Sequence, residues 1–501
     1  MDLFSTNFSL IDWVIVCIYL CIPLVVGLYL KKYIASSGDF IVAGRNLRLF
    51  LAIATLTGTE IGLVTVMYSA EAGFISGFSA FHIGVIEGAA FLAMGLTGFI
   101  VYKLRESRVM TIPEYYQKRY NQNVRVIGGI VLAVGGILNM GLFLQASARF
   151  VMGVTGMVDP ALLKIFMTIM LIMVIIYTMA GGMVGLAIND YIQFVVLSFG
   201  IIIASILVIK EIGWSNLFVI PEGAPSTFSF NPVSEASGFG PIYVIFMVMV
   251  SLAAGALWQT ATLRALAAKT PKVAKNLYAC ASLSFLMRKV LPMLWGGAAF
   301  IFLTVKAPQL WQAFQAGGYS SQYGMPIFIA KIIPSGLLGL LTAGMLAAFM
   351  STHDSYLLSW SSVITQDIIS PLKKGLTDKK LLKINRICIM LIGISNIIMG
   401  LWYEPPVSLW NFMAITGSIY LSGAFTVIVA GLYWKKASST GALLAVLLGL
   451  LALLGLGPWT AKGVWYLSDK FIGVSTYVLC AVGMIAGSLL FPDKKTAEEV
   501  R

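Results

Sequence analysis

Runs of apolar residues recur along the whole chain at the length of a membrane-crossing helix. About 20 residues of helix cross the hydrocarbon core of a bilayer, and the pattern predicts about 13 such crossings. The predicted crossings are 10–30, 47–72, 77–103, 124–152, 160–180, 185–209, 240–262, 280–304, 334–366, 384–402, 407–433, 438–457 and 472–491. Only helices and closed barrels satisfy backbone hydrogen bonds in lipid, so runs of this length predict an all-α integral membrane protein.

Two of these crossings carry polar or glycine-bearing segments at mid-span. They are Thr55–Glu60 in the second crossing and Ser251–Gly255 in the seventh. The two crossings are five apart and therefore run in opposite directions. Interrupted helices at matching places in two halves are typical of inverted-repeat transporters with a binding site at the membrane midplane. The alternative is two ordinary helices with glycine kinks, since glycine is common in membrane helices.

A face of oxygen-bearing side chains runs along the ninth crossing, in the stretch Met345–Asp367. Its serines are spaced by four, four and three residues and share one helix face: Ser351, Ser355, Ser359 and Ser362. Asp354 flanks this face. Such oxygens suit a hard cation and a polar route leading away from it. Small hydroxyl residues also occur where membrane helices pack, which is the alternative interpretation.

Acidic and histidine residues fall inside predicted crossings, among them Glu60, Glu87, Asp190, His353 and Asp354. Charges at that depth are costly and usually functional. Asp190 either faces the serines or caps a helix. Glu87 is either a substrate contact or the buried partner of a neighbouring helix. His353 points away from the serine face and is expected to make a structural hydrogen bond.

Three further sets of residues are interpreted from their positions. Trp258 and Gln259 follow the second interrupted segment, where they either line a substrate pocket or only pack. Arg288–Lys289 are interpreted as part of a helix extension near the cytoplasm. No Gly-rich phosphate loop, paired-histidine metal motif or nucleophile elbow occurs, so no enzymatic activity is predicted. The five cysteines have no metal or redox spacing.

Composition and charge agree with a membrane protein. Of the 501 residues, 59% are hydrophobic and 11% are charged, whereas soluble domains carry about 25% charged residues. The net charge of +13 comes from basic residues that follow alternate crossings, as in Lys103–Arg108, Arg264–Lys275 and Lys373–Arg386. This positive-inside pattern predicts an N-terminus outside and a C-terminus in the cytoplasm. This pattern accounts for the basic residues, so nucleic-acid binding is not needed to explain the net charge.

Five motifs, in this order, resemble the sodium/solute symporter family over nearly the full length of the chain. They are ATLTGTEIG at 54–62, TIPEYYQKRY at 111–120, AGGMVGLAINDYIQ at 180–193, WQTATLRALAAK at 258–269 and AAFMSTHDSYLLSWSS at 347–362. The resemblance implies a leucine-transporter-like core of two inverted five-helix repeats, with one helix before and two after. The implied organisation is an extra helix at 1–43, a first repeat at 44–211, an extracellular loop at 212–239, a second repeat at 240–434, and two helices with a cytoplasmic tail at 435–501.

The resemblance also implies where Na⁺ binds. Carried onto this chain, the ligands are the main-chain carbonyls of Ala54, Thr57 and Ala348 and the hydroxyls of Ser351 and Thr352. A second cation or proton site would include Asp190, Asp354 and Ser355. Two residues depart from the family pattern. Asp354 stands where members often have a small or hydroxyl residue, and Asn189 replaces the threonine usual before Asp190.

The function expected from these residues is Na⁺-coupled symport of a small organic solute, such as a sugar, amino acid or carboxylate, by alternating access. Na⁺ is the coupling ion, and Glu60, Glu87, Trp258 and Gln259 are the candidate substrate contacts. Two alternatives remain: a proton-coupled symporter using Asp354 and Asp190, and a transporter-like solute sensor. The expected partners are the solute and membrane lipid, with no nucleic acid and no obligate protein partner. The expected location is a plasma membrane of the bacterial inner-membrane type.

Overall fold

A computed structural model of the chain describes residues 3–30, 37–220, 224, 229–373, 375–403, 409–457, 459–460 and 468–493. Helices dominate this part of the chain, and it contains no β-strand. An isolated parallel bridge joins Leu47 to Ala268. The predicted tail beyond Asp493 lies outside the described residues.

The first half of the chain supplies the helices α1 (Leu10–Leu30), α2 (Ser37–Val42), η2 (Ala43–Arg45), α3 (Leu49–Glu60), α4 (Leu63–Ser76), η3 (Gly77–Ala80), α5 (Phe81–Thr97), α6 (Val101–Glu106), α7 (Ile112–Arg119), α8 (Gln122–Met140), α9 (Phe143–Thr155), α10 (Pro160–Ile212) and α11 (Trp214–Leu217). The second half supplies η4 (Glu235–Ser237), α12 (Gly240–Leu257), α13 (Gln259–Ala267), α14 (Pro271–Ile301), η5 (Phe302–Lys306), α15 (Pro308–Ala316), η6 (Ser321–Tyr323), α16 (Gly324–Ile332), α17 (Leu337–Val363), η7 (Ile364–Ile369), α18 (Ser370–Leu372), α19 (Asp378–Trp402), α20 (Leu409–Tyr433), α21 (Ser439–Leu448), η8 (Gly449–Leu456) and α22 (Asp469–Leu490).

Ten helical segments of the described chain are long and apolar enough to cross a membrane. The predicted number is about 13, and the difference of three has two causes: two of the ten segments each contain two crossings, and one further crossing is not among the ten. The segment Leu63–Thr97 joins α4 to α5, which are separate crossings, and α17 is too polar to qualify. The 53-residue α10 would be about 80 Å long if straight, more than two bilayer cores. Gly182, with φ 49° and ψ −153°, divides it into two crossings.

Both predicted interruptions exist, but a few residues later than the sequence indicated. Thr55–Glu60 stays helical as the end of α3, and the break falls on Ile61 and Gly62. Ser251–Gly255 also stays helical, and the second break is Trp258 with φ −66° and ψ 120°. Gly255 was misread because it serves close packing instead of unwinding: a Cβ there would lie 2.4 Å from Cε of Met94 in α5.

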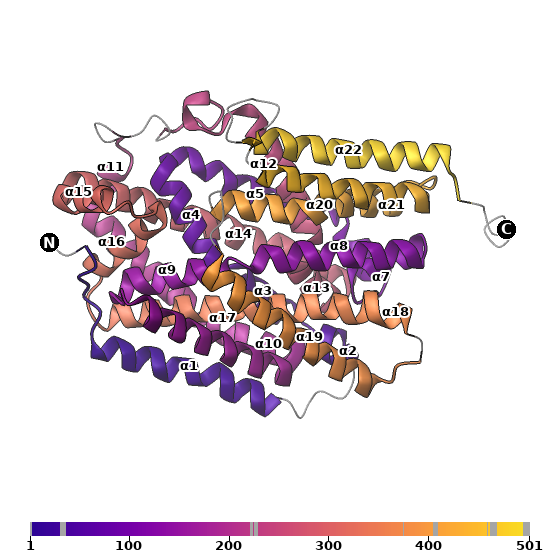
Figure 1. Ribbon diagram of the computed structural model, residues 1–501, viewed down its shortest axis with the longest axis horizontal. Helices are drawn as coiled ribbons and strands as arrows, with labels where there is room; N and C mark the ends of the chain where they lie inside the picture. Colours follow the sequence, from indigo (N-terminus) through magenta and orange to yellow (C-terminus); the bar gives the residue numbers. More distant parts are fainter. Residues whose placement is uncertain are drawn as a thin grey trace.

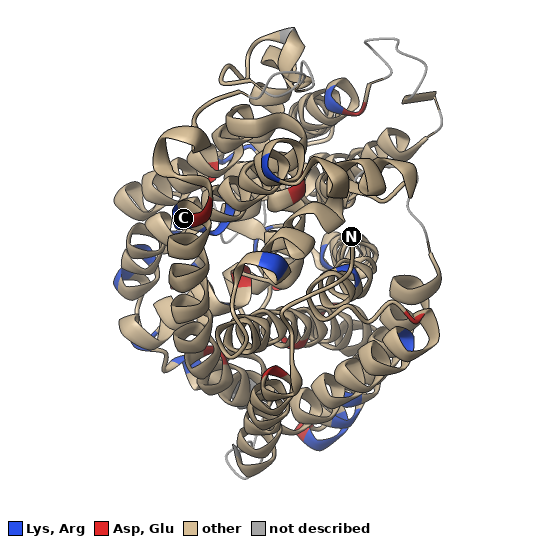
Figure 2. Cartoon of the chain, turned by 90° about the vertical axis from the view of Figure 1, so that its left-hand side faces the viewer, with Lys and Arg blue, Asp and Glu red and all other residues tan. Residues whose placement is uncertain are grey.

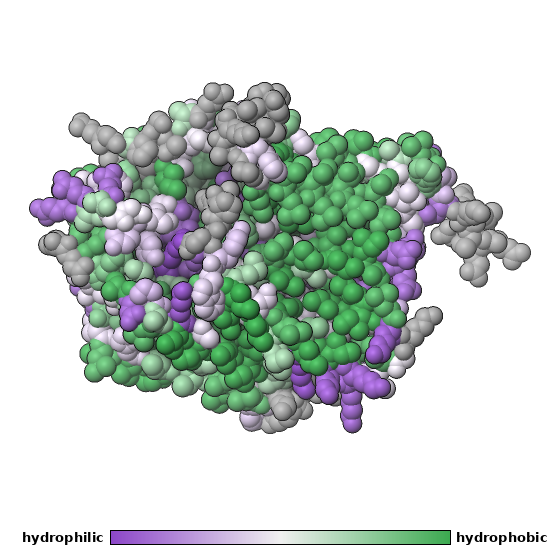
Figure 3. All heavy atoms as spheres, viewed as in Figure 1, coloured by the Kyte–Doolittle hydropathy of each residue, from purple (hydrophilic) through white to green (hydrophobic). Residues whose placement is uncertain are grey.

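The helices form a bundle whose surface matches a bilayer. A broad apolar surface covers its middle, and hydrophilic residues gather at its two ends (Figure 3). α1 begins at one end of the long axis and α22 ends at the other, as an odd number of crossings requires (Figure 1). Viewed along that axis, most residues are uncharged, yet acidic and basic residues lie within the bundle as well as at its rim (Figure 2). These interior charges mark the sites described next.

Candidate functional site

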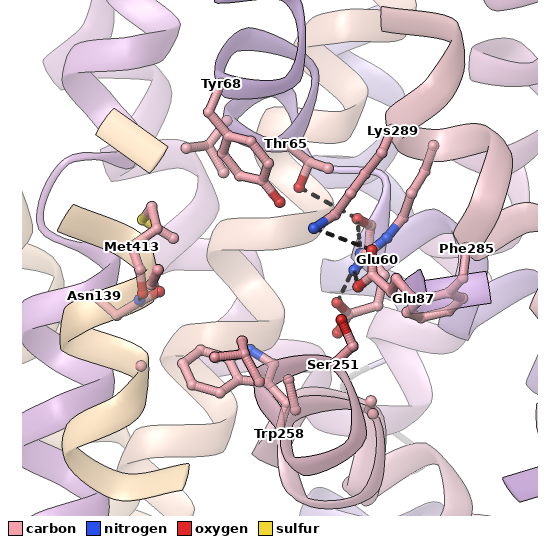
Figure 4. A pocket seen from close by; sticks show the side chains of 18 of the residues that line it. Glu60, Thr65, Tyr68, Glu87, Asn139, Ser251, Trp258, Phe285, Lys289 and Met413 are labelled. Carbon is pink, nitrogen blue, oxygen red and sulfur yellow. Dashed lines mark hydrogen bonds and ion pairs between the residues drawn. The ribbon is translucent and has the colours of Figure 1, made fainter. Parts of the chain in front are cut away.

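A cavity of about 110 Å³ lies beside both helix breaks, between α4, α5, α8, α12, α14 and α20. It is bounded by charged side chains on one side and by Asn139 and Met413 on the other (Figure 4). Tyr68 and Trp258 lie at opposite ends of the space (Figure 4). The broken helices therefore deliver side chains to a hollow inside the bundle, where a small solute has room to bind.

Four buried charged residues form one ion-paired cluster on the cavity wall. Arg288 donates from Nη1 to Glu60 Oε2 at 3.0 Å and from Nη2 to Glu87 Oε1. Lys289 Nζ lies 3.1 Å from Glu87 Oε2. The Thr260 hydroxyl donates to Glu60 Oε1 at 2.6 Å. Two carboxylates face two cations, so the cluster as a whole is electrically neutral.

Aromatic rings complete the cavity wall. Lys289 Nζ lies 4.3 Å from the centre of the Trp410 ring, and the Tyr68 ring centre is 4.7 Å from that of Trp410. Trp258 Nε1 donates to the Tyr356 hydroxyl at 2.7 Å. Flat apolar faces next to charged groups suit a solute that has both a ring face and polar substituents.

Asn139 on α8 presents an acceptor from the opposite wall. Its Nδ2 donates to Met413 O and Thr416 Oγ1, each at 2.9 Å. Its Oδ1 is buried and has no partner in the described structure. A buried acceptor without a partner is costly, so this oxygen is positioned to receive a donor from a bound solute.

A second hollow of about 200 Å³ lies beyond the ring pair, where α12, α20 and α22 begin. It shares Tyr68 and Trp410 with the cavity, and Asn411 and Lys470 line it. Asn411 Nδ2 donates to Asp469 Oδ2 at 2.8 Å. The Tyr68–Trp410 ring pair thus separates the inner cavity from a polar vestibule.

The break in the first core crossing contacts the serine face of α17. The Thr352 hydroxyl lies 3.0 Å from Thr59 O and 2.9 Å from Ala348 O. A Cβ at Gly62 would lie only 2.3 Å from Thr352 Oγ1, so glycine allows this approach. The five residues of the predicted Na⁺ site are all buried, on α3 and α17: Ala54, Thr57, Ala348, Ser351 and Thr352.

A second, fully buried cluster lies next to those residues. Asp190 Oδ1 accepts from Ser351 at 2.6 Å, and Asp190 Oδ2 accepts from Thr59 and from Arg264 Nη2, each at 3.1 Å. Arg264 Nη2 also lies within bonding distance of Ser355 Oγ. The predicted second cation site therefore already contains a guanidinium.

Asp354 has a different environment in the same cluster. Its Oδ2 accepts from the Tyr177 hydroxyl at 2.8 Å and its Oδ1 from Ser355 at 3.1 Å. It forms no ion pair with a basic residue in the described part of the chain, although it is 0% exposed. With Asp190 and Arg264, the cluster holds two carboxylates and one guanidinium.

The candidate substrate contacts separate into two groups. Glu60, Glu87 and Trp258 line the cavity, whereas Gln259 does not, and its amide atoms are buried without partners among the described residues. Glu87 is the buried ion-pair partner of Arg288 and Lys289 on α14 and also lines the cavity, while its contact with a substrate stays a prediction. His353 Nδ1 bonds the Phe349 carbonyl at 2.8 Å, within its own helix.

Sequence reasoning missed four residues of these clusters. Arg288–Lys289 were expected in a helix extension near the cytoplasm, but both side chains are buried in the middle of α14, where Glu60 and Glu87 neutralise them. Arg264 was counted as a topology signal but is 0% exposed. A lone Asn139 in an apolar run carried no signal. Arg288 and Lys289 fall inside the predicted crossing 280–304, and that position was a signal for buried bases that need acidic partners.

Comparison with known proteins gives consistent similarities. A family model described as "Sodium:solute symporter family" matches residues 40–449. The chain is 22% identical to the sodium/sialic acid symporter SiaT of Proteus mirabilis over 98% of this chain and 97% of that protein. It is 24% identical to sodium/glucose cotransporter 1 of Oryctolagus cuniculus, covering 88% of this chain and 70% of the cotransporter. The osmoregulated proline transporter OpuE of Bacillus subtilis is 22% identical over 94% and 93%.

Solved structures show the same fold. An outward-open, substrate-bound Na⁺-coupled sialic acid symporter superposes with a TM-score of 0.80 at 20% identity, covering 98% of this chain and all of that one. The nucleobase-cation-symport-1 family transporter Mhp1 gives a TM-score of 0.51 at 13% identity, covering 92% and 97%. The overall arrangement of the helices is therefore shared with these transporters.

Proposed function

The chain belongs to the sodium:solute symporter family and is a sodium-coupled solute symporter; we propose that its solute is a neutral, polyhydroxylated molecule that binds between Lys289, Trp258 and Asn139. The observation that carries this proposal is the neutral ion-paired cluster on the cavity wall. Because its charges already compensate each other, it offers strong donors and acceptors without a net charge to attract an ion.

The chemistry of the cavity fits several hydroxyl groups better than one charged group. Glu87 accepts and Lys289 donates on one wall, and Asn139 Oδ1 accepts on the other. Trp258 and Tyr68 supply ring faces for the apolar C–H face of a sugar-like ring. The relative named for glucose transport supports this solute class, whereas the relatives named for sialic acid, a sugar acid with a negative charge, and for proline, a zwitterion, represent the charged alternatives.

We propose that Na⁺ binds between the first helix break and α17. Its ligands would be the carbonyls of Ala54, Thr57 and Ala348 and the hydroxyls of Ser351 and Thr352. Support comes from their burial and from the contact between Thr352 and Thr59 O at the break. A cation there would tie the broken helix, which also carries Glu60 of the solute cavity, to α17. Each ligand then favours binding of the other by reciprocal linkage.

The cluster of Asp190, Asp354, Ser355 and Arg264 is proposed as a second monovalent-cation site. Its charges sum to one excess negative charge in a fully buried place, and such a charge requires a counter-ion or a proton. Na⁺ at Asp354 meets this requirement. Proton coupling through Asp354 and Asp190 is the competing outcome, in which a pH gradient replaces the Na⁺ gradient.

Topology and repeat boundaries complete the proposal. The extra helix at 1–43 would precede inverted repeats at 44–211 and 240–434, joined by an extracellular loop at 212–239, and two helices and a tail at 435–501 would follow. The helix breaks at Ile61–Gly62 and Trp258 support this pairing. We place the N-terminus outside a bacterial-type plasma membrane because basic residues gather beyond alternate crossings.

Uptake into proteoliposomes tests the function. Vesicles with an inward Na⁺ gradient are offered radiolabelled hexoses, polyols, sugar acids and proline, with a K⁺ gradient as the reference. We expect a neutral polyol or sugar to accumulate only with Na⁺. Ser351→Ala and Thr352→Ala should remove most of the Na⁺ dependence, whereas Ser361→Ala should not, because that buried hydroxyl bonds only Leu358 O of its own helix. Accumulation of proline or of a sugar acid in place of a neutral sugar or polyol would refute the solute class, and unchanged Na⁺ dependence in both variants would refute the site.

A further inference from the structure

A basic pocket of about 410 Å³ lies at the end of the bundle where α6 meets the start of α14, and it shares no lining residue with the transport cavity or the vestibule. Four basic side chains and one acidic side chain line it together with the start of α14: Arg45, Arg105, Arg108, Lys269 and Glu106. They come from three separate segments, namely η2 before the first core crossing, α6 after α5, and the junction of α13 and α14. The transport mechanism makes no use of these residues.

Within the described residues, the guanidinium groups of this pocket have no carboxylate partner. Arg105 is 6% exposed, and its hydrogen bonds go to main-chain carbonyls, from Nε to Ala268 O at 2.7 Å and from Nη2 to Lys269 O at 3.3 Å. Arg45 Nη2 donates to Arg108 O at 2.7 Å, and its Nε is buried without a partner in the described structure. No described ion pair involves Arg45, Arg105 or Arg108. Burial and the neighbouring Arg45 and Arg108 lower the pKa of Arg105, as expected where positive charge is uncompensated.

The backbone at the pocket is strained at two arginines. Arg45 has φ 59° and Arg108 has φ 56°, and they are two of the four residues other than glycine with positive φ in the described chain. Positive φ in a residue with a long side chain is unfavourable and is concentrated at functional positions. Here the two strained residues are those whose side chains line the basic pocket.

The start of α14 adds to the positive potential. Thr270 caps this 31-residue helix, accepting from Val273 N, and Pro271 occupies its first turn. A helix N-terminus carries partial positive charge and free N–H groups. Arginine binds phosphate oxygens through a planar fork of donors, so several arginines next to a helix N-terminus suit a doubly charged, tetrahedral anion better than a halide.

We propose that this pocket binds a phosphomonoester, carried either by a soluble molecule or by a lipid headgroup. The bound phosphate would link the segment before α3, the end of α5 and the α13–α14 junction. Leu47 already bonds this junction, through Leu47 N to Ala267 O at 3.1 Å and Lys269 N to Leu47 O at 2.8 Å. The anion would therefore join the ends of both broken crossings and favour the state in which this end of the bundle is closed.

Binding to the full chain in lipid nanodiscs tests the proposal. One arm titrates inorganic phosphate onto protein in phosphatidylcholine nanodiscs, and the other compares these discs with discs that contain phosphatidic acid. The readout in both arms is the melting temperature, which rises when a ligand binds the folded state. Arg108→Gln and Arg45→Gln are expected to abolish most of the rise. Lys272→Gln, the same charge change at an exposed residue of α14 that does not line the pocket, should preserve it.

A rise in either arm that depends on Arg108 and Arg45 but not on Lys272 supports the site, and the arm that responds identifies the carrier. No rise in either arm, or equal loss in all three variants, would overturn it. Sodium-driven uptake is not needed for this measurement, so failure here does not bear on the transport function.

Discussion

Arg264 and Asp190 form an ion pair of 3.1 Å between two side chains that are both 0% exposed. Arg264 belongs to α13, directly after the second helix break, and Asp190 belongs to the second half of α10. The pair connects the half-helix that follows one break to a neighbouring crossing. It also places a fixed positive charge beside the proposed cation ligands.

Replacing Arg264 with glutamine should destabilise the protein by about 3–5 kcal/mol, because a buried carboxylate loses its counter-ion. The measurement is thermal unfolding of the purified protein in detergent. Combining Arg264→Gln with Asp190→Asn removes both charges and should recover part of the loss. A double variant as unstable as Arg264→Gln alone would show that the ion pair is not the cause.

Gly62→Ala should impair Na⁺-dependent transport strongly, because the new Cβ would lie 2.3 Å from Thr352 Oγ1 and push the helix break from α17. The Na⁺ concentration for half-maximal uptake is expected to rise about tenfold, equal to about 1.4 kcal/mol. Gly185→Ala is the matched control, since the nearest atom to its Cβ would be 4.0 Å away. Equal uptake by both variants would argue against the close contact at Gly62.

Two ion pairs of equal length should respond very differently to neutralisation. Lys289–Glu87 and Lys306–Glu211 both measure 3.1 Å, but the first pair is buried and the second is 39% and 40% exposed. Glu87→Gln leaves buried cations unbalanced and should abolish solute uptake. Glu211→Gln should change the free energy of unfolding by less than about 1 kcal/mol and leave uptake intact. Similar effects from the two substitutions would contradict the assignment of Glu87 to the solute site.

Trp410→Ala should raise the KM for the solute, since it removes a ring that borders the cavity and lies 4.3 Å from the Lys289 ammonium. A cation–π contact of this kind contributes about 0.5–2 kcal/mol. Trp410→Phe keeps an aromatic face and should have a smaller effect. Initial uptake rates over a range of solute concentrations give KM and kcat for both. An unchanged KM in Trp410→Ala would show that the ring does not contribute to solute binding.

The crossings were predictable because apolar runs of bilayer length leave few alternatives to a helix. The exact break positions were not, since a glycine such as Gly255 reads the same whether it unwinds a helix or admits Met94. Thr352 contacts the last turn before the helix break at Thr59 O, whereas Ser351 donates to Asp190 on α10, and Na⁺ binding by these residues stays a prediction.

The buried ion pairs of the site were harder to predict. Arg264 and Lys289 resemble topology signals in one dimension, and their partners Asp190 and Glu87 lie 74 and 202 positions away along the chain. Burial of a base becomes visible only when its acid is placed beside it in space. Asn139 gave no signal at all, because a single amide in an apolar run is compatible with helix packing as well as with binding.

The corner at Gly182 sets the depth of Asp190 in the membrane. No loop separates the two crossings of α10, so neither can slide along its axis independently of the other. Asp190 follows the corner by eight residues, which is about 12 Å of helix at 1.5 Å per residue. The depth of the Asp190 carboxylate in the membrane is therefore fixed relative to Gly182. An insertion between Gly182 and Asp190 would shift the carboxylate along the helix axis and rotate it away from Arg264.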